Sequence, residues 1–273
     1  QGPGKEVWQP KNYDGTSSFG PSTLRLGIEK SRNQMTVRLA QDMGMPLIVE
    51  YSKRFGVYDD LLPVLAMSLG SGETTLVRMA AAYSTIANGG KQVRPTPVDR
   101  IQDRWGHTIW RHDQRECKSC KVERWAGQAE PALADDRRQI IDPHTAYQMT
   151  SMMEGVVQRG TANIISKMLP NVPIAGKTGT TNDEKDAWFI GYSPDLVVGV
   201  FVGYDTPTPM GKGNTGGKVA APEASLIHDL GRVQVAPEAE LTGGAERTSH
   251  GAPGLAGDAD RGARRRSGAA PTA

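Results

Sequence analysis

Lys177, Thr178 and Gly179 form a short motif whose residue types suit the recognition of a carboxylate. The motif precedes two apolar segments that are typical of strands. On a strand, Thr178 and Thr180 would project to the same face. Lys177 would supply a fixed positive charge for a substrate carboxylate, and Gly179 would let a substrate backbone approach the strand. The pattern therefore favours serine acyl transfer beside a K-T-G strand.

A phosphate-binding P-loop is a competing interpretation of the same residues. That motif needs a glycine five residues before Gly176, where this chain has Asn171, and it should lead into a helix rather than into strands. A surface turn with a solvated lysine is the third interpretation, because a lone K-T-G tripeptide is common by chance.

A second motif of the same chemistry, S-x-N, is present as Ser31, Arg32 and Asn33. Ser31 lies on the apolar side of a helical pattern, so its hydroxyl is expected to need a buried partner. Asn33 would lie about 200° further round an ideal helix. For both side chains to face one cleft, the helix must break near Arg32 into two helices. An ordinary pair of polar helix residues is the alternative.

The elements that must position these motifs follow from periodicity and turn residues. Helices come first and strands last, without regular βαβ alternation, which predicts an α+β fold with an antiparallel sheet. Helices are expected over 23–42, 46–56, 74–88, 143–157 and 161–168, a short one over 223–230, a hairpin with a long loop over 91–125, and strands over 187–192 and 196–204.

Composition narrows the function further. The 273 residues carry 32 Lys plus Arg and 30 Asp plus Glu, so the near-balanced charge does not indicate a nucleic-acid partner. No apolar run approaches the ~18–20 residues of a membrane span. Five histidines without a metal-binding pattern predict no metal, and no cofactor is expected.

Three longer stretches carry a resemblance to a known family. They read FGPSTLRLGIEKSRNQMTVRL (19–39), LGSGETTLVRMAAAYSTIANGG (69–90) and AGKTGTTNDEKDAWFIGYSPDLVVGVFVGYD (175–205). Together with the intervening residues, about 5–222 resemble the C-terminal part of the transpeptidase domain of class A penicillin-binding proteins, which are bifunctional peptidoglycan synthases. The resemblance implies the fold shared with serine β-lactamases, in which helices flank an antiparallel sheet.

The resemblance also implies roles for the motif residues. Ser31 would pass a proton to the leaving amine, and Asn33 would bind the amide of the peptide. Lys177 would stabilise the region of Ser31, while Thr178 and Thr180 would contact the terminal carboxylate. The implied partners are peptidoglycan stem peptides that end in D-Ala-D-Ala, with β-lactams as inhibitors. The implied location is the periplasmic face of the bacterial inner membrane, reached through an N-terminal anchor outside this chain.

One departure from the family matters. Its nucleophile lies in an S-x-x-K motif, yet no serine in this chain has lysine three residues later. The expectation is an N-terminally incomplete domain that cannot acylate itself. A DD-carboxypeptidase or serine β-lactamase on the same scaffold stays an alternative, as does a non-catalytic module that binds peptidoglycan or a partner protein.

The remaining expectations concern the cysteines and the tail. Cys117 and Cys120 are expected to form a local disulfide in the extracytoplasmic setting that the family implies, with two free thiols as the alternative. The transpeptidase part is expected over 1–222, with a loop and hairpin insertion around 91–130. Residues 223–273, rich in Gly, Ala, Pro and Arg, are expected to be a disordered tail, either natural or produced by a reading-frame shift.

Overall fold

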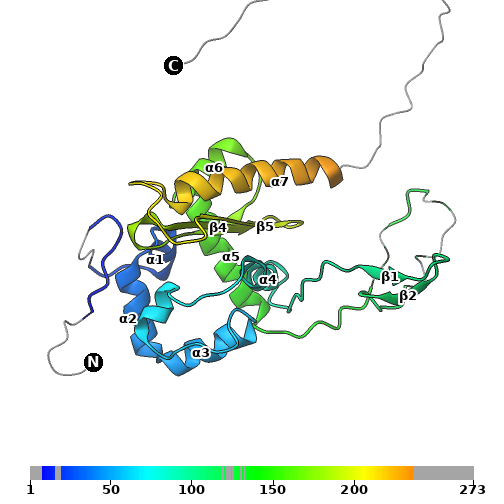
Figure 1. The fold of residues 1–273 in the computed structure, drawn as a ribbon, viewed down its shortest axis with the longest axis horizontal. Coiled ribbons are helices and arrows are strands. Elements are labelled where there is room, and N and C mark those ends of the chain that lie inside the picture. Colours follow the sequence, from blue (N-terminus) through cyan, green and yellow to red (C-terminus); the bar gives the residue numbers. More distant parts are fainter. Residues whose placement is uncertain are drawn as a thin grey trace, which may run out of the picture. The chain divides into compact units, whose positions relative to one another are not determined.

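The computed structural model describes residues 8–15, 20–117, 120, 124, 126–129, 131 and 133–235. Residues 1–235 form one compact unit, and the second unit, 236–273, lies outside the described residues. The expected tail therefore lies mostly outside them. In chain order, the elements are α1 (Leu24–Glu29), α2 (Asn33–Met43), α3 (Met45–Arg54), the 3₁₀ helix η1 (Leu65–Leu69), α4 (Leu76–Ala87), β1 (Arg100–Gln102), β2 (Thr108–Arg111), α5 (Pro143–Gln158), α6 (Asn163–Met168), β3 (Ala175–Thr180), η3 (Asn182–Glu184), β4 (Asp186–Tyr192), β5 (Val197–Gly203), the π-helical turn η4 (Gly216–Ala220) and α7 (Ala221–Val235) (Figure 1).

The central sheet is antiparallel, with strand order β3-β4-β5. Helices α6 and α7 lie on one side of this sheet, and α4 and α5 lie on the other (Figure 1). The predicted α+β fold, with an antiparallel sheet flanked by helices, is confirmed. The strand that carries K-T-G is at an edge of the sheet, where Thr178 pairs with Phe189 of β4.

The core lies between the sheet and its covering helices. Phe189 is the largest of its fully buried side chains. A Cβ on Gly176 would lie 2.5 Å from the Phe189 ring, and one on Gly191 would lie 2.6 Å from it. These two glycines therefore make room for the ring within the sheet. The other buried members include Val156, Ala162, Ile165, Ala187, Val198 and Ala220.

Helix α7 is longer than the sequence suggested. The expected helix covered 223–230, whereas the structure has an α-helix from Ala221 to Val235. Ala224 and Ser225 of this helix are buried. Small side chains thus let α7 lie close to the core despite the lack of aromatic residues after Tyr204. No helix among the described residues is both long and apolar enough to cross a membrane.

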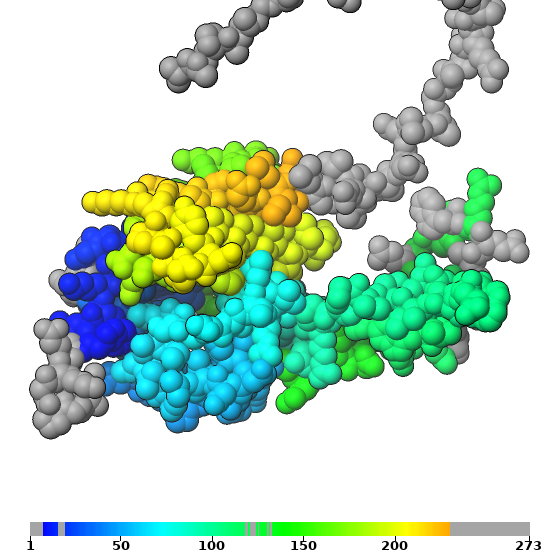
Figure 2. All heavy atoms as spheres, viewed as in Figure 1, coloured from blue at the N-terminus to red at the C-terminus, as the bar shows by residue number. Residues whose placement is uncertain are grey.

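Between α4 and α5 lies a segment that we call the arm, residues 91–142. Its strands β1 and β2 form a separate two-stranded antiparallel sheet, and every residue in them is exposed. Figure 1 shows two extended segments that connect this sheet to α4 and α5. In the space-filling view of Figure 2, the arm extends outward from the sheet region. In the arm, Cys117 and Cys120 are joined by a disulfide.

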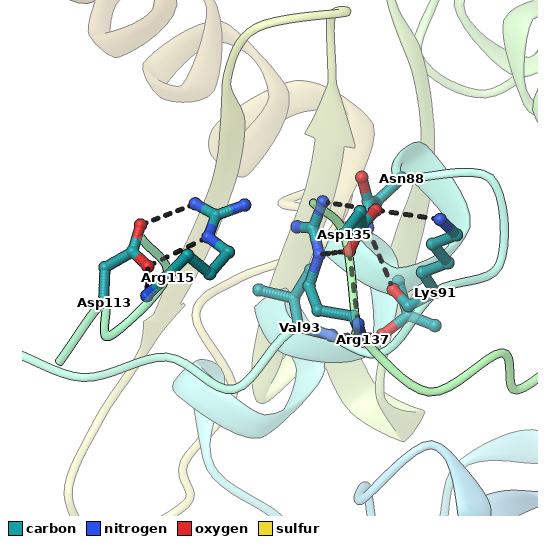
Figure 3. Close-up of polar contacts among 8 residues, drawn as sticks. Asn88, Lys91, Val93, Asp113, Arg115, Asp135 and Arg137 are labelled. Carbon is teal, nitrogen blue, oxygen red and sulfur yellow. Dashed lines mark hydrogen bonds and ion pairs between the residues drawn. The ribbon is translucent and has the colours of Figure 1, made fainter. Parts of the chain in front are cut away.

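Exposed ion pairs order the base of the arm (Figure 3). Asp135 accepts hydrogen bonds from Arg137 Nε at 2.8 Å and from Lys91 Nζ at 3.0 Å. These cations hold the pKa of the Asp135 carboxyl well below its usual range. A similar contact joins Asp113 to Arg115. Because these pairs face solvent, we expect each to contribute little to stability.

Candidate active site

Lys177 of β3 and Ser31 meet directly, although 146 residues separate them. The Lys177 Nζ donates a 2.8 Å hydrogen bond to Ser31 Oγ and another of 2.8 Å to the carbonyl oxygen of Thr178. Burial lowers the pKa of Lys177 from 10.5 to about 8. The amine is therefore mostly charged at pH 7 and can release its proton slightly above that pH. Since Lys177 is the donor, the Ser31 hydroxyl keeps its own proton for another acceptor.

Ser31 stands in the break between α1 and α2, as predicted. Its N–H donates to Ile28 O at 3.2 Å, and the Arg32 N–H donates to Gly27 O at 2.9 Å. This pair of bonds is the Schellman motif that ends many helices. Its left-handed position is usually occupied by glycine, yet here Ser31 has φ of +52°. From this turn the Ser31 side chain contacts Lys177 of β3.

The other S-x-N residue has a different partner. The Asn33 side-chain amide donates to Lys11 O at 2.9 Å. The Gln34 N–H donates to the buried Asn12 side chain at 3.3 Å. Residues 10–12 therefore pack along the start of α2. This contact places Asn33 against the N-terminal segment, while Ser31 contacts the sheet.

The K-T-G strand has polar contacts on both sides of Gly179. The hydroxyls of Thr178 and Thr161 lie 2.6 Å apart, and Thr180 Oγ1 accepts from the Gly216 N–H at 3.1 Å. A Cβ on Gly179 would lie 3.1 Å from Trp188 Cβ. The missing side chain of Gly179 thus relieves packing on the neighbouring strand, and its expected role in letting a substrate approach stays a prediction.

Two contributors to the site have no role in the sequence-based interpretation. Thr161 is expected from the sequence only as the start of a helix, and Gly216 has no expected role. A Cβ on Gly216 would lie 2.5 Å from Gly179 O and 2.3 Å from Trp188 O, so only glycine lets η4 lie so close to the sheet. The glycine pair at 216–217 was the available signal, because close backbone approach is a common reason for glycine.

Figure 2 shows a recess in the surface of the molecule. In Figure 2 it lies between the yellow residues that follow β5 and the blue residues of the first helices. Within the described part of the chain, no group of three or more His, Cys, Asp or Glu residues could hold a metal ion. The groups that the candidate site offers for chemistry are a serine hydroxyl, a lysine amine and threonine hydroxyls.

The chain matches the family model described as "Penicillin binding protein transpeptidase domain" over residues 1–229. It therefore belongs to the penicillin-binding protein transpeptidase family, whose members cross-link peptidoglycan.

Particular relatives refine this assignment. The chain is 48% identical to penicillin-binding protein 1A of Rickettsia bellii over 226 residues, which are 81% of this chain and 28% of that protein. It is also similar to the crystal structure of penicillin-binding protein 1A from Haemophilus influenzae, with a TM-score of 0.69, 26% identity, and coverage of 84% of this chain and 37% of that one. Penicillin-binding protein A from M. tuberculosis, solved as an imipenem acyl-enzyme complex, shares the fold with a TM-score of 0.61 at 22% identity, over 83% of this chain and 52% of that one. The chain thus spans less than a third of the length of its Rickettsia relative.

Proposed function

We propose that this chain supplies the S-x-N and K-T-G walls of a peptidoglycan D-Ala-D-Ala transpeptidase site on the periplasmic face of a bacterial inner membrane. The contact between Lys177 Nζ and Ser31 Oγ carries the proposal, because it joins the two motifs at hydrogen-bond distance. Membership in the transpeptidase family supports it. β-Lactams are then expected to act as inhibitors.

In the proposed reaction, a serine oxygen attacks the carbonyl carbon of the penultimate D-Ala of a stem peptide. The bond to the terminal D-Ala nitrogen breaks, and that nitrogen gains a proton. Ser31 is placed to relay this proton, since Lys177 donates to its oxygen and leaves its hydroxyl proton free to move. An amine from a neighbouring peptidoglycan strand then attacks the ester carbonyl. This step forms the cross-link and releases the serine, whose oxygen regains a proton from the amine.

Lys177, Thr178 and Thr180 form the anion-binding side in this proposal. The charged amine stabilises the terminal carboxylate of the substrate, and the threonine hydroxyls donate to it. In the structure these hydroxyls contact Thr161 and Gly216. Asn33 binds the peptide amide after its contact with Lys11 O is exchanged. The Thr180 N–H serves as one oxyanion-hole donor, a role often worth about 3 kcal/mol.

We further propose that these 273 residues lack the acylating serine, because none of their serines has the S-x-x-K spacing. The test is incubation of the purified chain with a fluorescent penicillin. We expect no covalent band, and a saturable serine adduct on this chain would overturn this part of the proposal.

A complementation experiment tests the cross-linking site itself. The S-x-x-K segment that family membership implies for the Rickettsia bellii relative would be joined in front of this chain, and acylation by fluorescent penicillin measured. We expect acylation that falls at least about 100-fold in Lys177→Ala, because the charge on the binding wall is lost. Tyr147→Ala, which changes a side chain that is 74% exposed, is the matched control and should acylate normally. Equal acylation of Lys177→Ala and its parent would contradict the proposed role of this wall.

The absence of S-x-x-K also favours a second candidate, a non-catalytic module that binds peptidoglycan peptides. The two candidates differ in one measurement on the complemented protein. Release of D-Ala from a D-Ala-D-Ala peptide supports the enzyme. Saturable binding of that peptide without release supports the module. A carboxypeptidase or β-lactamase would instead transfer the acyl group to water, so hydrolysis without any cross-linked product would identify that alternative.

A further inference from the structure

The turn between α5 and α6, residues 159–161, contacts both motif segments. On one side, the Thr161 N–H donates to Glu29 O at 3.2 Å, and Lys30 Nζ donates to Arg159 O at 2.9 Å. On the other side, the Thr161 hydroxyl meets the Thr178 hydroxyl. One turn therefore touches the end of α1, two residues before Ser31, and the K-T-G strand.

An ion pair between the buried Glu29 carboxylate and the half-exposed Arg159 guanidinium joins this turn to α1. The Glu29 carboxylate, in a residue only 4% exposed, accepts from Arg159 Nε at 3.1 Å and from Arg159 Nη2 at 2.5 Å. Two glycines allow the close approach. A Cβ on Gly155 would lie 2.1 Å from Glu29 Oε1, and one on Gly160 would lie 2.4 Å from Glu29 O. The end of α1 is thus held through its backbone and its side chain together.

Ser31 needs such support, because its backbone is strained. A non-glycine residue in the left-handed region costs roughly 1–2 kcal/mol, and it persists where its surroundings fix it. The Schellman bonds fix the positions of Ser31 and Arg32 relative to α1. Nothing in those local bonds fixes α1 relative to Lys177. The Glu29–Arg159 pair contributes to this, together with the bond from the Thr161 N–H to Glu29 O and the bonds from Arg25 to Ser151, because α5 packs against β3.

We propose that Glu29 and Arg159 are positioning residues that hold Ser31 in its left-handed conformation against Lys177. The inference rests on the proposed function for the importance of Ser31, but its physical content concerns backbone conformation. An apolar pair of similar volume could fill the same space without loss of stability. A bidentate ion pair adds a fixed direction, which a proton relay requires.

The first test is a thermodynamic cycle on the whole 273-residue chain. Arg159→Met removes both donors, and it would be made in the parent chain, in Ser31→Gly and in Ser31→Ala. Glycine adopts the left-handed conformation without strain, whereas alanine keeps the strain and lacks the hydroxyl. We expect Arg159→Met to lower Tm by about 4 °C in Ser31→Gly, and by less than about 2 °C in the parent and in Ser31→Ala, because there the relief of backbone strain offsets part of the loss.

Two outcomes of this cycle would overturn the proposal. Equal losses of Tm in all three backgrounds would mean that the ion pair acts without reference to Ser31. Equal losses in Ser31→Ala and Ser31→Gly that both differ from the loss in the parent would mean that the coupling passes through the hydroxyl rather than the backbone. Circular dichroism checks that each variant folds. If Arg159→Met does not fold, Arg159→Lys, which keeps the charge but loses the bidentate contact, replaces it with the same expectations.

The second test uses the pKa of Lys177 to report whether Ser31 is in place beside it. The pH midpoint of the Lys177 ¹³Cε signal would be measured by NMR and assigned by its absence in Lys177→Met. Ser31→Ala should lower this midpoint, because the charged amine loses an acceptor. With Arg159→Met present, we expect the shift caused by Ser31→Ala to fall by at least half. An unchanged shift beside a lowered Tm would show a merely structural role.

These tests are independent of acylation. A failed complementation with fluorescent penicillin would contradict the proposed function while leaving the coupling between Arg159 and Ser31 intact. Conversely, a cycle without coupling would remove Glu29 and Arg159 from the positioning of Ser31 and leave the proposed function standing.

Discussion

The sheet region and the arm are built from opposite kinds of contact. In the sheet region, Phe189 and Val156 are buried and glycines allow backbones to touch, so residues far apart in the sequence fix each other. In the arm, β1 and β2 are exposed throughout, and neighbouring charges such as Asp113 and Arg115 pair along the chain. A side chain can be held within a few tenths of an ångström only in the first kind of region. The candidate site lies there.

Truncating a core side chain should give the largest difference in stability between the sheet region and the arm. Phe189→Ala leaves a cavity beside Gly176 and Gly191, and we expect it to lower the free energy of unfolding by about 4 kcal/mol. Trp105→Ala in the arm, where the side chain is 74% exposed, should change it by less than about 0.5 kcal/mol. Urea unfolding measures both. Similar losses for the two variants would mean that the arm shares the core.

A pair of glycine substitutions comes next in size. Gly160→Ala would bring a methyl group against Glu29 O and the Val156 backbone, and we expect a loss of about 3 kcal/mol. Gly106→Ala in the arm meets no atom within 4 Å but has φ of +86°, so it should cost about 1 kcal/mol. The same urea titration compares them. A larger loss at Gly106 would contradict the contrast between steric and conformational causes.

The lowered pKa of Lys177 should make the stability of the protein depend on pH. Its pKa in the folded chain, about 8, lies below the unfolded value of 10.5, so the unfolded chain binds more protons between these values. The free energy of unfolding should therefore rise by about 2 kcal/mol from pH 8 to pH 10. Lys177→Met should remove this rise. The window ends near pH 10, because burial raises the pKa of Tyr83 and Tyr192 and their effect has the opposite sign. A fall in wild-type stability from pH 8 to pH 10 would contradict the burial of the amine.

The disulfide should have the smallest effect. Cys117 and Cys120 close a loop within the arm, whose strands pair only with each other among the described residues. Replacing both cysteines with serine should shift the main thermal transition by less than about 1 °C. A fall of about 5 °C or more, measured by calorimetry, would show that the arm melts together with the sheet region.

Local patterns predicted the elements well. The conflict between Ser31 and Asn33 on one helix predicted the break near Arg32, and the structure places the end of α1 and the start of α2 on either side of it. The run of small residues before two apolar segments predicted the K-T-G strand and the following hairpin. These features depend on residues within a few positions of each other.

Local patterns could not predict contacts between residues that lie far apart in the sequence. Glu29 and Arg159 look like ordinary surface charges in the sequence, and 130 residues separate them. Asn33 contacts Lys11 O, which side-chain chemistry alone does not reveal because the acceptor is a backbone oxygen. The sequence does not predict the extension of α7 to Val235, because small buried residues such as Ala224 and Ser225 form no large apolar stripe.

The ion pair between Glu29 and Arg159 also closes a loop of chain that contains the whole arm. The entropy lost on closing a flexible loop grows only with the logarithm of its length, so doubling the loop adds about 0.6 kcal/mol. Insertions or deletions in the arm should therefore leave the closure, and with it the alignment of the two motifs, almost unaffected. The arm is the part of this chain where length can vary at little thermodynamic cost.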